Sequence, residues 1–233
     1  MTTRNIATRE EWLAARKELL DREKALSREH DALAQARRAL PWVKIEQDYV
    51  FETESGSASF DDLFGGYRQL IVQHFMLGPD WENGCVSCSF WADNFNGTIL
   101  HLNARNISFK VISSAPLAKI LPFKQRMGWT FDWVSSFGGS FNEDFNVSFG
   151  PDHKAEDTVF YNFRETNFPA DEAPGASAFA KGDDGTIYHT YSTYGRGLDV
   201  LNGAYAYMDI APFGRDEVAE GHKMGWLRHH DSY

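Results

Sequence analysis

The chain of 233 residues contains only two cysteines, Cys85 and Cys88, and they lie three positions apart. A disulfide framework in a small secreted protein uses more cysteines and spreads them along the chain. A close pair instead indicates thiol–disulfide chemistry or metal binding. The quartet Cys85-Val86-Ser87-Cys88 is therefore the first place to look for a function.

The elements around this quartet decide what the two thiols can do. Residues 69–76 form a nearly continuous apolar run, which predicts a central strand covered on both faces. A loop over 77–84 follows, and a helix is expected to begin near Cys85 and to run to about Arg105. The helix dipole and the unpaired N–H groups at such a start favour a thiolate over a thiol. We therefore expect Cys85 to be an exposed nucleophile with a pKa below about 8.5.

Cys88 lies one helical turn beyond Cys85, close enough to resolve a mixed disulfide by closing a small ring. A structural zinc site would need about two further ligands, and the chain has no second cysteine pair. Inert buried cysteines are the other alternative. We expect neither a metal nor a bound cofactor. The histidines considered as ligands are His74, His101, His189, His229 and His230.

The segments that follow the cysteines alternate between strand and helix. Residues 107–113 predict an apolar strand, and Pro116 suits the first turn of a helix that Gly128 ends. Residues 133–137 predict a further strand. Strand, helix, strand, helix, strand is typical of an α/β fold in which one central sheet is flanked by helices.

The C-terminal third is less regular. Several breakers lie between 138 and 176, with a short helix expected near 142–146. Segments 176–181 and 186–191 flank a Gly-Asp-Asp-Gly turn, which predicts a β-hairpin. A helix over 198–208 is expected to close the domain.

The N-terminal segment predicts one long helix over residues 8–40. Thr8 and Glu11 form a capping box, apolar residues recur at helical spacing, and Pro41 ends the run. Such a helix is roughly 50 Å long, longer than a small domain is wide. We interpret residues 1–40 as a helical extension of a domain over 41–233. The extension is expected to wrap its own domain or a second subunit in a homodimer; docking to another protein is the alternative.

The charge balance excludes some partners. Asp and Glu number 33 against 23 Lys and Arg, and the net charge of -10 disfavours nucleic acid. No apolar stretch approaches the ~20 residues of a membrane span. The polar N-terminus lacks the apolar centre of a signal peptide, so we expect a cytoplasmic protein without a membrane partner.

The residues around the cysteines resemble a bacterial thioredoxin-like family, domain-of-unknown-function family 899. The resemblance covers nearly the whole chain and implies a thioredoxin-like fold and a dithiol oxidoreductase activity, without naming a substrate. The matching stretches are Phe64-Gly65-Gly66, His74-Phe75-Met76, Gly78-Pro79-Asp80-Trp81, 84–93, Met127-Gly128-Trp129-Thr130, 189–197 and Arg228-His229-His230-Asp231.

The quartet departs from that of well-studied thioredoxins, which carry Trp before the first cysteine and Gly-Pro between the two. Here Gly84 precedes the pair and Val86-Ser87 separates it, so the redox potential is expected to differ. Thioredoxins also hold a cis-proline beside the cysteines. Pro174, which precedes a predicted strand, resembles that proline, although Gly175 and Ala176 intervene.

Peroxiredoxins share the fold but carry Thr or Ser three residues before their reactive cysteine and Pro seven residues before it. Glu82 and Gly78 occupy these positions relative to Cys85. Cys85 and Trp81 occupy them relative to Cys88. Neither cysteine fits, which argues against a standard peroxidase.

The sequence thus predicts a dithiol–disulfide oxidoreductase that acts on a protein or small-molecule thiol or disulfide. A divergent thiol peroxidase and a non-catalytic thioredoxin-like binding or dimerisation module are the alternatives. Trp81, Trp91 and Pro174 are candidate neighbours of the site, although both tryptophans could pack in the core instead. The terminal stretch His229-His230-Asp231 is expected at the surface, and only the family resemblance suggests a role for it.

Overall fold

The computed structural model of the chain describes residues 5–217 and 223–233. The chain divides into two compact units, Met1–Pro41 and Trp42–Tyr233. No helix within the described ranges is long and apolar enough to cross a membrane.

The first unit contains one long helix, α1 (Arg9–Arg38). Its capping box forms as the sequence predicts: the Thr8 hydroxyl accepts the Glu11 N–H at 3.2 Å, and the Glu11 carboxylate accepts the Thr8 N–H at 2.8 Å. Arg37 and Arg38 lie in the last turn, where cations favour the negative end of the helix dipole. The prediction of a long N-terminal helix is confirmed.

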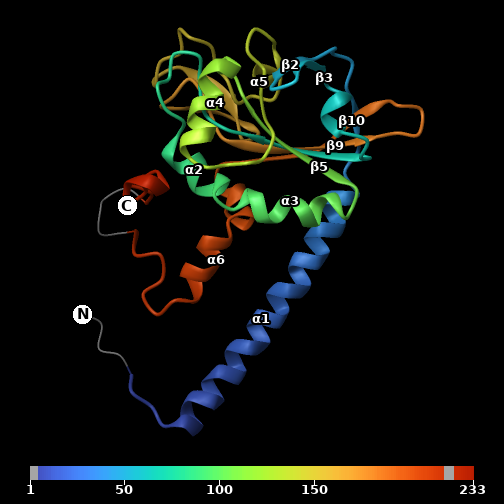
Figure 1. The fold of residues 1–233 in the computed structure, drawn as a ribbon. Helices are drawn as coiled ribbons and strands as arrows, with labels where there is room; N and C mark the ends of the chain where they lie inside the picture. The colour runs from blue at the N-terminus through green and yellow to red at the C-terminus, as the bar shows by residue number, and fades with distance from the viewer. Residues whose placement is uncertain (1–4, 218–222) are drawn as a thin grey trace. The chain divides into compact units, whose positions relative to one another are not determined.

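The second unit is built on an eight-stranded mixed sheet with the order β1-β10-β9-β4-β5-β6-β2-β3 (Figure 1). Strands β4, β5 and β6 are parallel to one another, whereas β9 is antiparallel to β4 and β10 is antiparallel to β9. The strands are β1 (Val43–Lys44), β2 (Val50–Thr53), β3 (Gly56–Ser59), β4 (Gln69–His74), β5 (Ile107–Ser113), β6 (Trp133–Ser135), β9 (Gly175–Lys181) and β10 (Ile187–Tyr194).

Helices connect the parallel strands, the antiparallel β9–β10 hairpin lies beside β4, and β1 and the β2–β3 hairpin form the two edges of the sheet. This is the arrangement of a thioredoxin-like fold, and it confirms the predicted α/β class. The helices are α2 (Val86–Ala92), α3 (Phe95–Asn103), α4 (Leu117–Arg126), α5 (Phe141–Asp144) and α6 (Gly203–Ile210), with 3-10 turns η1 (Asp62–Phe64), η2 (Gly195–Leu201) and η4 (His230–Ser232).

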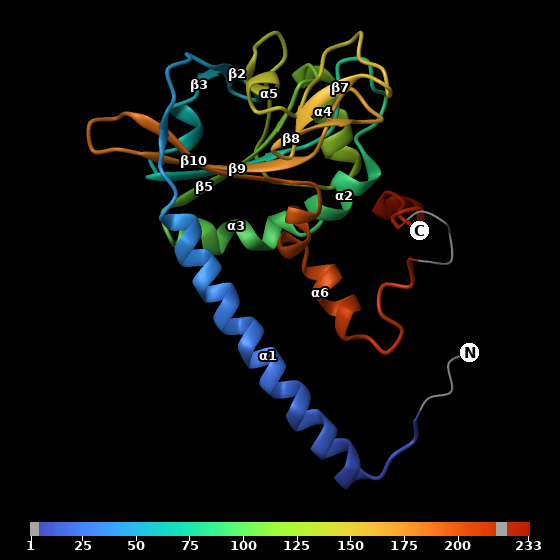
Figure 2. The ribbon, with the colours of Figure 1, turned by 180° about the vertical axis from the view of Figure 1, so that it is seen from behind.

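Three details differ from the predictions. The helix expected over 198–208 is divided into η2 and α6, because Asn202 has an extended backbone and caps α6, its side-chain oxygen accepting the Ala204 N–H at 3.0 Å. The single helix expected from Cys85 to about Arg105 is divided into α2 and α3, because the Asn94 side chain donates to the Phe90 carbonyl at 3.0 Å and competes with the backbone. The small hairpin of β7 (Thr158–Tyr161) and β8 (Arg164–Asn167) was not predicted (Figure 2). Its two turn residues both have positive φ, yet one of them is Phe163, a residue type that gives no turn signal.

Side chains from the two faces of the sheet form two hydrophobic clusters. Trp133 of β6 belongs to the cluster with α2, α3 and α4, and the next residue, Val134, belongs to the cluster with α5 and β2. Successive residues of a strand point to opposite faces, so one strand serves both cores. Figures 1 and 2 show α3 on one side of the sheet and α5 with the β2–β3 hairpin on the other.

Replacing Phe141 tests the second of these cores. The Phe141 ring is 1% exposed and lies 4.9 Å from the Tyr49 ring and 4.8 Å from the Phe145 ring. We expect Phe141→Ala to lower the free energy of unfolding by about 3–5 kcal/mol, measured by denaturant titration. The matched control Phe160→Ala removes a half-exposed ring and should cost no more than about 1 kcal/mol. Equal effects of the two variants would contradict this packing.

Candidate active site

Cys85 is the N-cap residue of α2, directly after the loop that follows β4. Its N–H donates to the Met76 carbonyl at 3.0 Å, and its own carbonyl accepts the Ser89 N–H at 3.0 Å. The Ser89 hydroxyl donates to the same carbonyl at 2.9 Å. The backbone of Cys85 is therefore held on both sides, while no disulfide engages its sulfur.

Cys88 lies in the first turn of α2, and the two thiols have different environments. Cys85 is half-buried, whereas Cys88 is only 4% exposed and belongs to the core beside α2 and α4. A thiol that reacts with a substrate must be accessible to that substrate. Of the two, Cys85 is the more accessible.

Close packing explains why glycine precedes Cys85. A Cβ atom on Gly84 would lie 2.5 Å from Cε1 of Phe123 and 2.7 Å from Cε1 of Phe75, both parts of buried rings. Only glycine lets the chain pass this close to the aromatic core. The tryptophan that thioredoxins carry at this position has no room here.

The surroundings of the pair separate the acidities of the two thiols. A hydrogen bond with the Cys88 thiol, together with the N–H groups of Cys88 and Ser87 and the Ser87 hydroxyl, lowers the pKa of Cys85 to about 7, although burial acts in the opposite direction. The same hydrogen bond and burial raise the pKa of Cys88. Cys85 can thus ionise near neutral pH while Cys88 keeps its proton, as a nucleophile and a resolving thiol require.

Glu172 is a buried carboxyl group on the segment before β9, and it is 2% exposed. Its Oε1 accepts the hydroxyls of Ser114 at 2.6 Å and Ser148 at 2.7 Å. Burial raises its pKa to about 7 despite these hydrogen bonds. The charge of Glu172 in turn contributes to the raised pKa of Cys88, so the two groups are electrostatically linked.

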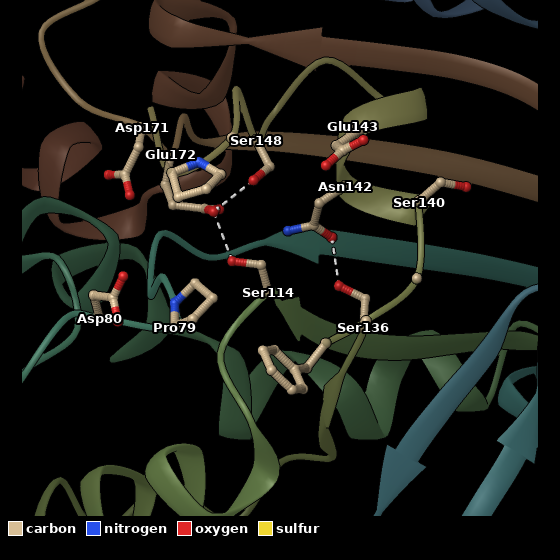
Figure 3. Close-up of a pocket in the computed structure, with 15 residues that line it drawn as sticks. Pro79, Asp80, Ser114, Ser136, Ser140, Asn142, Glu143, Ser148, Asp171 and Glu172 are labelled. Atoms are coloured by element: carbon tan, nitrogen blue, oxygen red, sulfur yellow. Dashed lines mark hydrogen bonds between the residues drawn. The ribbon is translucent and has the colours of Figure 1, made fainter. Parts of the chain in front are cut away.

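Glu172 also lines a cavity of about 590 Å³. The cavity lies beyond the carboxyl ends of β4, β5 and β6, the edge of an open α/β sheet where ligands commonly bind. In Figure 3 the carboxylate of Glu172 and the hydroxyls of Ser114 and Ser148 point toward one another at this cavity. Four carboxyl groups and no Lys, Arg or His are among its lining residues within the described part of the chain. The carboxyl groups belong to Asp80, Glu143, Asp171 and Glu172.

Sequence reasoning missed Glu172. The stretch from Asp171 to Gly175 reads as a break between elements, and only Pro174 within it is a candidate neighbour of the site. No local pattern distinguishes a buried glutamate there from an exposed one, because its hydroxyl partners Ser114 and Ser148 are 58 and 24 positions away.

The three candidate neighbours of the site have separate roles. The Trp81 indole N–H donates to the Asp171 carboxylate at 2.9 Å, and its ring packs against the core that contains Cys88. Trp91 is 7% exposed and donates to the Leu198 carbonyl at 2.8 Å, which makes it a core residue.

Pro174 directly precedes β9, but no cis peptide bond occurs in the described ranges, so its expected likeness to a cis-proline is wrong. Its carbonyl accepts the Tyr161 hydroxyl at 2.7 Å.

A chain of buried hydrogen bonds crosses the sheet near the end of β4. His74 Nε2 lies 2.8 Å from the Ser177 hydroxyl, which lies 2.8 Å from that of Ser192, which lies 2.7 Å from His189 Nε2. Burial lowers the pKa of His74 to about 3, so this ring is neutral at physiological pH. Within residues 5–217 and 223–233, no three His, Cys, Asp or Glu side chains are grouped to hold a metal ion.

The raised pKa of Glu172 predicts a pH-dependent stability. Because its folded-state pKa of about 7 exceeds the ordinary 4.5, the native state favours the protonated group, and stability falls as pH rises from about 4.5 through 7. We expect this contribution to be about 3 kcal/mol and to vanish in Glu172→Gln. His74, with its lowered pKa, acts in the opposite direction over part of this range. The quantity to measure is therefore the difference in unfolding free energy between wild type and variant, and a difference that is independent of pH would contradict the prediction.

Comparison with known proteins identifies similar structures and the family of the chain. Among solved structures, the chain is similar to a cysteine mutant of PrxQ from Xylella fastidiosa, with 14% identity, 71% of this chain and 95% of that chain covered, and a TM-score of 0.46. It is also similar to peroxidoxin BcpB from Mycobacterium tuberculosis, with 11% identity, 70% and 93% coverage and a TM-score of 0.45.

A search among curated proteins gave no match. The family model described as "Bacterial protein of unknown function (DUF899)" matches residues 1–233, the full length given. The expected family resemblance is therefore confirmed, and the chain belongs to the bacterial protein family DUF899.

Proposed function

We propose that the protein is a dithiol–disulfide oxidoreductase in which Cys85 attacks and Cys88 resolves. The position of Cys85 as N-cap of α2, one helical turn before a buried second thiol, carries this proposal. The lowered pKa of Cys85 and the raised pKa of Cys88 support the same division of roles.

In the first step, the Cys85 thiolate attacks one sulfur of a substrate disulfide. A bond forms between Cys85 and that sulfur, the substrate S–S bond breaks, and the second substrate sulfur leaves as a thiolate that takes up a proton. The N–H groups of Ser87 and Cys88 stabilise the charge on Cys85 before the attack.

In the second step, Cys88 gives up its proton and attacks the sulfur of Cys85. The Cys85–Cys88 disulfide forms and the remaining substrate thiolate leaves. The protein dithiol loses two electrons and the substrate disulfide gains them, so no bound cofactor takes part. Because the charge of Glu172 raises the pKa of Cys88, this step is expected to be easier when Glu172 is protonated.

Cysteine variants test this sequence of steps with a chromogenic aryl disulfide as substrate. We expect Cys88→Ser to react once and to remain as a mixed disulfide on Cys85, visible in the intact mass. Cys85→Ser should react at least about tenfold more slowly, because Cys88 is buried and its pKa is raised. Wild type should release both substrate thiols and end with the internal disulfide.

The opposite results select the alternatives. Thiols that react only after denaturation would indicate a non-catalytic binding module. Rapid consumption of a hydroperoxide by wild type but not by Cys85→Ser, without disulfide exchange, would indicate a thiol peroxidase.

A further inference from the structure

The C-terminal segment lies beside α2 in both Figures 1 and 2, where it is drawn in dark red. It contains His229, His230 and Asp231, whose role the sequence left open. These three residues contact both ends of α2, the helix that carries the two thiols, and the last residue of α4.

At the first end of α2, His229 binds the residue before Cys85. Its Nε2 lies 3.0 Å from the Gly84 carbonyl oxygen, which can only accept a hydrogen bond, so Nε2 carries the proton. Its Nδ1 lies 3.4 Å from Nη2 of Arg126, which can only donate. These partners suit Nε2 as the donor and Nδ1 as the acceptor, and the ring packs edge to face on Phe123 with a centroid distance of 5.3 Å.

The peptide unit between Gly84 and Cys85 is consequently held at both of its polar groups. Its carbonyl accepts from His229, and its N–H donates to the Met76 carbonyl at 3.0 Å. The orientation of this unit sets the direction in which the Cys85 side chain leaves the backbone. It thereby sets how the Cys85 sulfur faces the N–H groups of Ser87 and Cys88.

At the other end of α2, His230 binds the C-cap residue. His230 Nδ1 lies 2.6 Å from Oδ1 of Asp93, and the Trp129 indole N–H donates to the same oxygen at 2.8 Å. The C-terminal segment thus spans α2 from the residue before its N-cap to its C-cap.

Arg126 joins this segment to α4 and to the loop before Cys85. Its Nε and Nη2 donate to the two oxygens of Asp231 at 2.7 and 2.9 Å, and its Nη1 donates to Asn83 at 2.8 Å. A pair this exposed to solvent contributes little to overall stability, but its two-point geometry fixes where the segment lies.

We propose that His229, His230 and Asp231 act as a clamp that holds the Gly84–Cys85 peptide and the first turn of α2 in place, and thereby fixes the Cys85 sulfur against the N–H groups of that turn. They are positioning residues, and the proposal rests on the proposed role of Cys85 as nucleophile. His229 acts directly on the peptide before Cys85, and Asp231 holds His229 in place through Arg126.

Two conservative variants test the clamp in the full-length protein. His229→Phe keeps a ring against Phe123 but cannot donate to Gly84, and Asp231→Asn removes the charge that binds Arg126. The readout is the rate of Cys85 alkylation by iodoacetamide as a function of pH, followed by peptide mass spectrometry with Cys88 in place, because the hydrogen bond with the Cys88 thiol contributes to the low pKa of Cys85. We expect both variants to react at least about threefold more slowly near pH 6, and at the wild-type rate at high pH where Cys85 is fully ionised.

Asp209→Asn is the matched control, because Asp209 forms a similar two-point pair with Arg215, at 2.7 Å for both contacts, away from the cysteines. It should keep the wild-type alkylation profile. A clamp variant that lowers the melting temperature but leaves the alkylation profile unchanged overturns the clamp while the proposed function stands. A wild-type protein, with Cys88 in place, whose Cys85 titrates at about 8.5 or above overturns both.

Discussion

The backbone of Met76 is the point on which the candidate site depends. This residue follows β4 in the middle of the sheet, and its carbonyl accepts the N–H of Cys85 at 3.0 Å. Its N–H acts on the sulfur of Cys88 and counters part of the rise in that thiol's pKa. The backbone at the end of one buried strand therefore contacts Cys85 and influences the pKa of Cys88. The close passage of Gly84 over Phe75 and Phe123 is possible because this position has no side chain.

Three ionisable groups near this strand end have shifted pKa values. Hydrogen bonds from the first turn of α2 lower the pKa of Cys85, while burial and the shared hydrogen bond raise that of Cys88. Burial also raises the pKa of Glu172. The charge of this carboxyl group contributes to the raised pKa of Cys88, and the group lines the cavity at the same edge of the sheet. Clusters of shifted pKa values of this kind are typical of functional sites. The charge of Glu172 links Cys88 electrostatically to the carboxyl-lined cavity, although neither cysteine is among the residues that line it.

The sequence predicts the elements here better than the contacts between them. The strand at 107–113 was predicted with its observed bounds, because an apolar run between turn signals is a local pattern. The helix break at Asn94 and the turn at Phe163 depend on one side-chain hydrogen bond and on one unusual backbone conformation. Glu172 escaped notice, and the contact made by His229 could not be derived, for another reason: His229 contacts Gly84 across 145 positions, and no pattern within one segment contains that information.

The most direct test of this account is the far-ultraviolet absorbance of the thiolate as a function of pH, recorded for wild type and for Cys85→Ser. The account predicts that wild type gains one thiolate with a midpoint near pH 7 and that Cys85→Ser lacks this step entirely. A first thiolate that forms only above about pH 8.5, or a step near neutral pH that persists without Cys85, would contradict it.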